Sequence, residues 1–484
     1  MTDTDKEHVQ RALDTAVARG AGYADARVVD LVVEGLVVKN GAVEALTRRE
    51  SRGIGVRALV DGAWGFAGTA DLTVAAIDRA AAEAVAIARA SASVPGRRAD
   101  LGPPVTSRGV YRTPVARDAF AVPLDEKIDL LLAADREMRA VPGVTTTNGQ
   151  LLWQRERKTF GNSEGALVEQ ELCETGCGIG ATAVGHGEVQ NRSYPNSFRH
   201  QVTRGFEFVT ELDLPGNARR VGEEAVALLT AKQCPQDITT TLILDSSQLA
   251  LQIHESCGHP IELDRVYGTE LDFAGGSFLR PDELGQLRYG SELVNIYADA
   301  TVPGALGTFG YDDEGVPARR APIIRDGLLV GYLTDRQYAQ RLGVPAMGAA
   351  RADGWNRAPL VRMTNVSIEP GAWTLDNLIA DTDDGIYMET NRSWSIDDQR
   401  LNFQFGTEVA YEIKGGQRGA LLKNATYTGV TPRFWGSMDA ICDRGHYVMW
   451  GLPNCGKGRP GQVMHTGHGA APARFRNVRV GVVR

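Results

Sequence analysis

Hydrophobic residues near the start of the chain recur at the spacing of a helix, which predicts a helix over residues 5–20. The stretch that follows is rich in Val and is interrupted by the turn-forming pairs Asn40-Gly41 and Asp61-Gly62. Such pairs favour tight hairpins, so this stretch predicts antiparallel strands. An alanine-rich helix then begins after a cap at Asp71 and continues to about Ala92. Helix, strands and helix together indicate a small α/β layer.

A segment without clear periodicity, residues 94–122, separates this layer from the next group of elements. It is rich in Pro, Arg and Ala, and we expect a linker or covering loop there. A helix is predicted near residues 124–140, followed by a hairpin whose turn lies at Asn162–Gly165. An amphipathic helix over residues 216–232 ends before Cys234-Pro235, where a new unit begins.

The sequence changes in character from about Gln236 onwards. A short β-branched strand, TTTLILD, leads into the helix SSQLALQIHESCG, and after it Gly and Pro are frequent. Turn-forming pairs at Asp326-Gly327 and Gly415-Gly416 indicate further hairpins. We therefore predict an α+β fold in two domains, an N-terminal α/β-layer domain over residues 1–234 and a β-rich C-terminal domain over residues 235–484.

The segment HESCGH (His254–His259) is similar to the zinc-peptidase signature H-E-x-x-H, but its second histidine comes one residue late. Residues four apart on a helix differ in direction by about 40°, whereas residues five apart differ by about 140°. His254 and His259 can therefore serve one ion only if the helix widens into a π-bulge or ends between them. Gly258 is a natural helix terminus, and Pro260 discourages continuation. The alternative is that these are two core histidines that happen to be neighbours.

A catalytic metal usually has three protein ligands and one open position, so two histidines need a third partner. Glu262 and Asp264 are the near candidates in the sequence. Cys455 is a distant one, in a Gly-rich turn among polar residues, and His465 and His468 follow it in HTGH. Spacing alone does not choose among these residues.

Composition narrows the class of protein. The chain has 484 residues, of which 43% are hydrophobic and 23% charged, with a formal net charge of -8. This composition is ordinary for a globular protein and the length is ample for a large core. A mildly acidic chain without long basic runs is a poor candidate for nucleic-acid binding.

The beginning of the chain is charged and lacks the basic and apolar regions of a secretory signal. The sequence contains no run of about 18 apolar residues, so we expect no membrane span. Six cysteines in so long a chain are unlike a disulfide framework. We therefore expect a cytoplasmic protein with reduced thiols.

Two other groups of residues invite a chemical interpretation but have a simpler one. Asp312, Asp313 and Glu314 in GYDDEGVP are most simply a solvated turn. Cys173 and Cys177 lie four residues apart on a predicted strand and face the same side, which favours a core pair over a metal site.

Several segments spread over nearly the whole chain resemble the TldD/PmbA family of metallopeptidases, also called gyrase-modulator-like proteins. The most specific of them is HESCGHPIELD, followed late in the chain by CGKGRPGQ. The segments are Gly53–Leu59, Gly65–Thr73, Gly161–Ala166, His254–Asp264, Gly307–Arg320, Val361–Gly371 and Cys455–Gln462. The stretch Met388–Gly406 is unlike the best-known motif-bearing members, and CGKGRPGQ is longer than the compact form of that loop.

The resemblance implies a function and a ligand set. It implies that His254, His259 and Cys455 bind Zn²⁺ and that Glu255 is the catalytic base of peptide hydrolysis by metal-activated water. It also implies small or unfolded peptides as substrates. As partner it implies a second copy, or a related subunit that lacks the motif. Two alternatives stay open: a non-proteolytic metal-dependent amide or ester hydrolase, and a mainly structural subunit of such a dimer.

Overall fold

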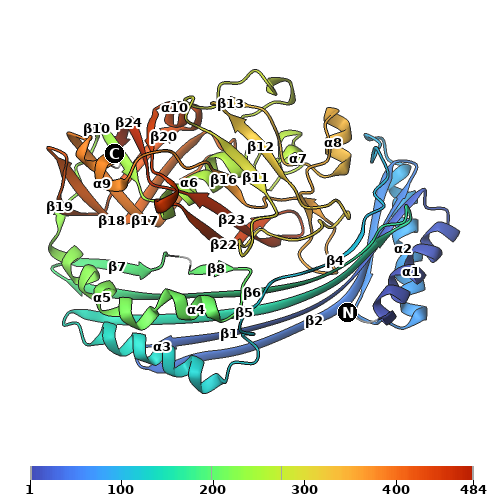
Figure 1. Ribbon diagram of the computed structural model, residues 1–484. Helices are drawn as coiled ribbons and strands as arrows, with labels where there is room; N and C mark the ends of the chain where they lie inside the picture. Colours follow the sequence, from blue (N-terminus) through green and yellow to red (C-terminus); the bar gives the residue numbers. More distant parts are fainter. Residues whose placement is uncertain (1–2, 198, 274, 482–484) are drawn as a thin grey trace.

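The computed structural model describes residues 3–197, 199–273 and 275–481. Two large mixed layers make up the molecule, so the fold is α+β as predicted. A long curved sheet from the N-terminal half runs beneath the C-terminal half, whose strands form a second sheet (Figure 1). The candidate metal site belongs to the C-terminal half.

The first group of elements matches the pattern of helix, strands and helix. Its bounds are α1 (Asp3–Ala18), β1 (Tyr23–Lys39), β2 (Ala42–Val60), β3 (Ala63–Thr69) and α2 (Val74–Ala92). The turn pairs Asn40-Gly41 and Asp61-Gly62 all have positive φ, which Asn, Asp and Gly tolerate best, and the two hairpins are confirmed. The second helix begins later than expected, because the Asp71 carboxylate accepts from the Thr73 amide in a turn before the helix.

The next elements complete the N-terminal sheet. They are β4 (Arg108–Arg112), α3 (Leu124–Arg139), β5 (Val144–Asn162), β6 (Leu167–Gly185), β7 (Glu188–Tyr194), β8 (His200–Val202), α4 (Glu207–Leu212) and α5 (Leu214–Thr230). The strand order is β3-β2-β1-β5-β6-β4, and β7 and β8 also pair with β6. The expected linker over residues 94–122 is wrong in part, because β4 pairs in parallel with β6 at the sheet edge. A segment of five residues is too short for alternating polar and apolar positions to identify a strand from the sequence alone.

The C-terminal half is rich in strands, as predicted. Its larger sheet has the order β17-β10-β24-β20-β18-β19-β9, and an additional pairing of β17 with β18 closes part of it into a ring. The strands of this sheet are β9 (Lys232–Gln233), β10 (Ile238–Leu244), β17 (Asp384–Ile396), β18 (Asn402–Lys414), β19 (Gln417–Lys423), β20 (Thr426–Val430), β21 (Met438–Ile441) and β24 (Ala473–Val480). The turns at Asp326-Gly327 and Gly415-Gly416 join hairpins as expected.

Smaller sheets and short helices surround this ring. The two-stranded ribbon of β22 (Val448–Lys457) and β23 (Gln462–Ala470) carries the late CGK segment. The other elements are α6 (Ser246–Ile253), η1 (His254–Gly258), α7 (Leu263–Val266), η2 (Pro281–Glu283), β11 (Ile296–Asp299), β12 (Arg320–Arg325), β13 (Leu328–Leu329), α8 (Arg336–Leu342), β14 (Ala350–Arg351), β15 (Leu360–Val361), β16 (Val366–Ile368), α9 (Leu375–Ala380), α10 (Thr431–Gly436) and η3 (Arg444–His446).

The acidic run Asp312–Glu314 is not a solvated turn. Its three side chains are buried between the two halves of the molecule. Asp313 pairs with Lys158 of β5 at 2.8 Å, and Glu314 pairs with Arg57 of β2 at 2.9 Å. The solvated interpretation is wrong because the cations that neutralise these carboxylates lie more than a hundred residues earlier in the chain.

All six cysteines are free thiols. Cys177 is buried and Cys173 is half-buried on the same strand, β6. No helix in the described ranges is long and apolar enough to span a bilayer.

Candidate metal centre

The helix that carries HESCGH is specified at its start and widens at its end. The Asp245 carboxylate caps α6 by accepting from the amides of Ser247 at 2.8 Å and Gln248 at 3.0 Å. After Ile253 the helix continues as the π-turn η1, in which the amide of His259 donates to the carbonyl of His254 at 3.1 Å. This hydrogen bond spans five residues instead of four, so the π-turn absorbs the additional residue and the predicted bulge is confirmed.

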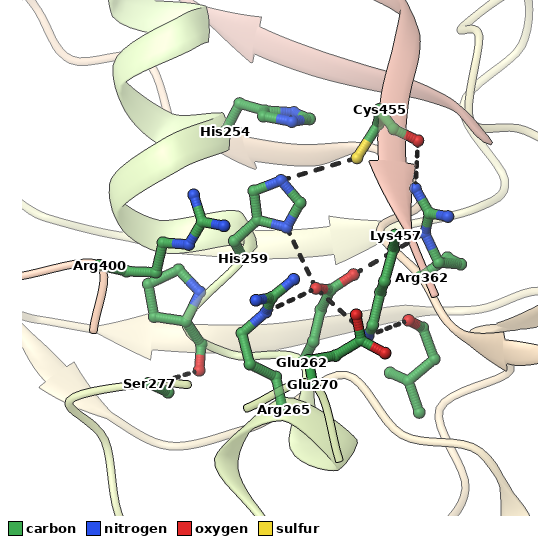
Figure 2. Close-up of polar contacts among 12 residues, drawn as sticks. His254, His259, Glu262, Arg265, Glu270, Ser277, Arg362, Arg400, Cys455 and Lys457 are labelled. Carbon is green, nitrogen blue, oxygen red and sulfur yellow. Dashed lines mark hydrogen bonds and ion pairs between the residues drawn. The ribbon is translucent and has the colours of Figure 1, made fainter. Parts of the chain in front are cut away.

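The π-turn brings both histidines to the Cys455 thiol of β22 (Figure 2). One ligand atom from each of His254, His259 and Cys455 lies within 4.8 Å of the others, and all three side chains are buried. The distance from His259 Nε2 to Cys455 Sγ is 3.7 Å. Zinc–ligand bonds of about 2.3 Å to sulfur and 2.0 Å to nitrogen, at a tetrahedral angle, would place these two atoms about 3.5 Å apart. The distance therefore fits one shared ion.

His468 determines which ring nitrogen of His254 carries the proton and which one can bind a metal. His468 Nδ1 lies 2.8 Å from the carbonyl oxygen of Val366, which can only accept, so Nδ1 carries the proton. Burial holds the pKa of His468 well below its usual value, and its Nε2 is therefore an acceptor. His254 Nδ1, 2.8 Å away, donates to it. Burial also lowers the pKa of His254, so its Nε2 is left with a lone pair, as a metal ligand requires.

The buried carboxylate of Glu262 likewise determines which ring nitrogen of His259 carries the proton. Its Nδ1 lies 3.1 Å from Glu262 Oε2 and donates to it. Burial raises the pKa of Glu262, but Lys457, His259 and Arg265 outweigh this effect and hold it well below the usual range. Burial lowers the pKa of His259, so the neutral ring presents its Nε2 lone pair toward Cys455. Glu262, a candidate ligand by spacing, thus lies behind a histidine instead of joining the cluster.

The third member of the cluster is a thiol whose pKa lies below its usual value. Burial raises the pKa of Cys455, but Arg362 and His259 outweigh it, and the pKa is lower than usual. Arg362 also donates to the carbonyl oxygen of Cys455 and so holds the strand in place (Figure 2). A thiolate is the form of cysteine that binds metals.

Glu255 is adjacent to His254 and is also buried. Its Oε2 lies 3.2 Å from Arg400 Nη1, on the turn that joins β17 to β18. This contact could not be predicted from local sequence patterns, because Arg400 lies 145 residues after Glu255. Arg400 fixes the orientation of the Glu255 carboxylate beside the cluster.

The other sequence candidates lie apart from the three ligand atoms. Asp264 pairs with Lys457 at 2.7 Å. His465 faces Glu174 of the N-terminal sheet, with its Nδ1 2.6 Å from Glu174 Oε2. Sequence reasoning missed Lys457 and Arg362, which support Glu262 and Cys455. Lys457 could have been noticed in the sequence, because it is the lysine of CGKGRPGQ and lies two residues after Cys455.

The arrangement of these side chains defines a class of protein. Two neutral imidazoles and a thiol of lowered pKa converge in a buried site, with a carboxylate on the residue that follows the first histidine. Such a donor set with an adjacent carboxylate is typical of metal-dependent hydrolases.

Comparison with known proteins gives the family. Residues 238–481 match the family model described as "PmbA/TldA metallopeptidase C-terminal domain". Residues 24–88 match the model of domain 1 of the same metallopeptidases, and residues 117–232 match the model of their central domain. The chain belongs to the PmbA/TldD metallopeptidase family.

Individual relatives agree with this assignment. A metalloprotease of Methanocaldococcus jannaschii is 29% identical over 422 residues, which are 87% of this chain and 89% of the relative. A zinc metalloprotease TldD homolog of Saccharolobus solfataricus is 26% identical over 241 residues, about half of each chain (50% and 51%). The solved structure of a putative modulator of DNA gyrase from Thermotoga maritima superimposes with a TM-score of 0.77 at 18% identity, covering 98% of this chain and 100% of that one. At that identity the solved structure shows the shared fold alone.

Proposed function

We propose that this protein is a zinc-dependent peptidase in which His254, His259 and Cys455 hold Zn²⁺ and Glu255 is the general base. The observation that carries the proposal is the convergence of two imidazoles on a thiol of lowered pKa, with each ring donating its Nδ1 proton to a fixed partner and so keeping Nε2 unprotonated. The name of the Saccharolobus relative, a zinc metalloprotease, supports zinc as the metal.

The donor set fits this ion better than the common alternatives. A thiolate and two imidazoles suit zinc, whereas magnesium and calcium prefer oxygen ligands. Three protein ligands leave one coordination position open. Zinc in such a site acts as a Lewis acid and makes a water molecule acidic near neutral pH.

The residues of the chain supply the remaining chemistry. Glu255 accepts a proton from the attacking water and passes it to the amine of the leaving group, an assistance worth roughly 10²–10⁴ in rate. Arg400 holds the Glu255 carboxylate in position. His468 and Glu262 fix the two imidazole rings through Nδ1, so that each Nε2 would be free to bind the ion.

Burial of the site limits the substrate. His254, Glu255, His259 and Cys455 are each at most 6% exposed, so the surface of a folded protein does not reach them. We therefore infer that the substrates are small or unfolded peptides. The family resemblance also leads us to propose a dimer, either of two copies or with a related chain that lacks HESCGH. The change in sequence character near residue 235 leads us to propose a division into two domains there.

The test is zinc analysis of the purified protein together with mass-spectrometric detection of peptide cleavage, alone and with any motif-lacking relative. We expect one zinc per chain and cleavage of short peptides. Glu255→Gln should keep zinc and lose turnover. Cleavage by this variant at the original rate would remove Glu255 as the base, and a protein that holds no zinc would contradict the proposal.

A further inference from the structure

A cavity of about 480 Å³ lies between the N-terminal sheet and the ribbon of β22 and β23. Its walls come from β1, β2, β5 and β6 on one side, and from the ribbon and the segment 351–357 on the other. Figure 1 shows the ribbon above β5 and β6. A volume of this size suits a small ligand or a few residues of a peptide.

The cavity borders the ribbon that carries Cys455, but none of His254, His259 and Cys455 lines it. Met464 pairs with Cys455 across the ribbon, and paired residues direct their side chains to the same face. His465 is the next residue and so faces the other way, where it meets Glu174. Met464, on the same face of the ribbon as Cys455, lines the cavity together with Val463 and His465.

The carboxylates of the cavity are already engaged by the protein. Lys158 pairs with Glu156 at 3.1 Å and with Asp313 at 2.8 Å. Glu174 accepts from His465 at 2.6 Å and from the Gln201 amide at 2.7 Å. These six groups pair with one another without a ligand.

Two more acids in the wall bind backbone amides. Asp312 accepts from the amides of Glu314, Val316 and Ala350, and burial, with the charge of Glu314, raises its pKa to about 8. Asp353 accepts from the amide of Val463 at 2.8 Å. In the described part of the chain, neither carboxyl group lies within 4.0 Å of a basic side-chain nitrogen.

Three guanidinium groups of the cavity have no such partner. Among the described residues, no carboxylate lies within 4.0 Å of the guanidinium nitrogens of Arg351, Arg49 or Arg357. Arg351 donates through Nη1 to the carbonyl oxygens of Met363 at 2.9 Å and His465 at 2.7 Å. Burial lowers its pKa to about 10, so it stays charged at neutral pH. Arg49 is exposed, and Arg357 donates to the carbonyl of Asn356 in its own loop.

We propose that this cavity binds a carboxylate, with Arg351 as the inner contact and Arg49 and Arg357 as contacts nearer the solvent. Arginine pairs with carboxylates through two parallel hydrogen bonds, and a half-buried arginine without an acid partner lacks this stabilisation. The ring of Phe309 lies 5.4 Å from the Arg351 guanidinium and provides an apolar wall beside it. The carboxylate belongs either to a peptide, at its C-terminus or an acidic side chain, or to a free small carboxylic acid.

The experiment measures binding by titration calorimetry to the zinc-loaded full chain with Glu255→Gln, so that the result does not depend on hydrolysis. The probes are glutarate, trialanine with a free C-terminus and trialanine amide. We expect Arg351→Gln to weaken binding of the acidic probes at least tenfold. The double variant Arg49→Gln/Arg357→Gln should weaken this binding several-fold without disturbing the carbonyl contacts of Arg351. If Arg351→Gln does not fold, the double variant alone tests the proposal.

Arg97→Gln is the matched control, because Arg97 is exposed and lies outside the cavity. Preference for free trialanine over its amide identifies a peptide as the source, and equal or tighter binding of glutarate identifies a free acid. Absence of binding for every acidic probe would overturn the proposal. Binding that survives both sets of arginine substitutions would also overturn it, since the carboxylate would then sit elsewhere, for example on the zinc.

Discussion

Arg57 of β2 lies 2.9 Å from Glu314, and this ion pair joins the N-terminal sheet to a loop of the C-terminal half. The same guanidinium lies 2.7 Å from Asp25 of β1. Arg57 is 8% exposed and each of the two carboxylates 1%, so all three charges are withdrawn from water. The two halves therefore depend on one another for the neutralisation of buried charge.

Removing the shared cation should destabilise the protein strongly. Arg57→Ala leaves Asp25 and Glu314 buried without their cation, and we expect a loss of about 3–5 kcal/mol in the free energy of unfolding. The measurement is chemical denaturation followed by fluorescence. Arg48→Ala on the same strand is the control, because its pairs with Glu34 and Glu50 are exposed and should be worth less than about 1 kcal/mol. Equal losses in the two variants would contradict the interpretation.

The third ligand is tested by the zinc content. Cys455→Ala removes the thiolate from the cluster, and we expect the purified variant to lose most of its zinc. Cys442→Ala is the matched control, since Cys442 is also a buried free thiol but lies outside the cluster. Full zinc stoichiometry in Cys455→Ala, measured by plasma mass spectrometry, would exclude Cys455 as a ligand.

His468 should act through His254. In His468→Ala the Nδ1 proton of His254 loses its acceptor, and the ring is no longer held in one orientation. Substitution of such a supporting residue typically lowers metal affinity 10–100-fold. The measurement is competition with a zinc chelator. His465→Ala, on the same strand but the opposite face, should keep the original affinity, and a similar loss in both variants would indicate a general effect on the ribbon.

His200 should make the protein sensitive to acid. Burial lowers its pKa from 6.5 to about 4, while its Nε2 donates to the carbonyl of Met449 at 3.0 Å. The unfolded chain therefore binds the proton first, and stability is lost as the pH falls from about 6.5 towards 4. The lowered pKa of His200 corresponds to a loss of about 3 kcal/mol in the free energy of unfolding at the acid end of this window.

The measurement is thermal or chemical unfolding of chelator-treated protein between pH 4 and 7, so that release of zinc does not contribute. His200→Gln should show a weaker pH dependence than the original protein in this window. His186→Gln, at an exposed position, should keep the original dependence. An unchanged profile in His200→Gln would show that other groups cause the acid sensitivity.

Much of the fold and part of the site could be predicted because the signals are local. The Asn40-Gly41 and Asp61-Gly62 turns need a positive φ that few residues adopt, so their positions fix the hairpins. The spacing of His254 and His259 required a π-turn or a helix end, and the structure has the π-turn. Both follow from geometry within a few consecutive residues.

The sequence by itself thus determined the α+β class, most helices and hairpins, and the two histidines with their neighbouring glutamate. Only the tertiary structure decided what lies next to them. It separated His468 from His465, which are three residues apart on one strand but on opposite faces, and it placed Glu262 behind His259. It also buried Asp312–Glu314 and brought Arg400 to Glu255. The physical reason is that dihedral preferences and periodicity act along the chain, whereas charge pairing and ligand convergence depend on contacts between distant segments.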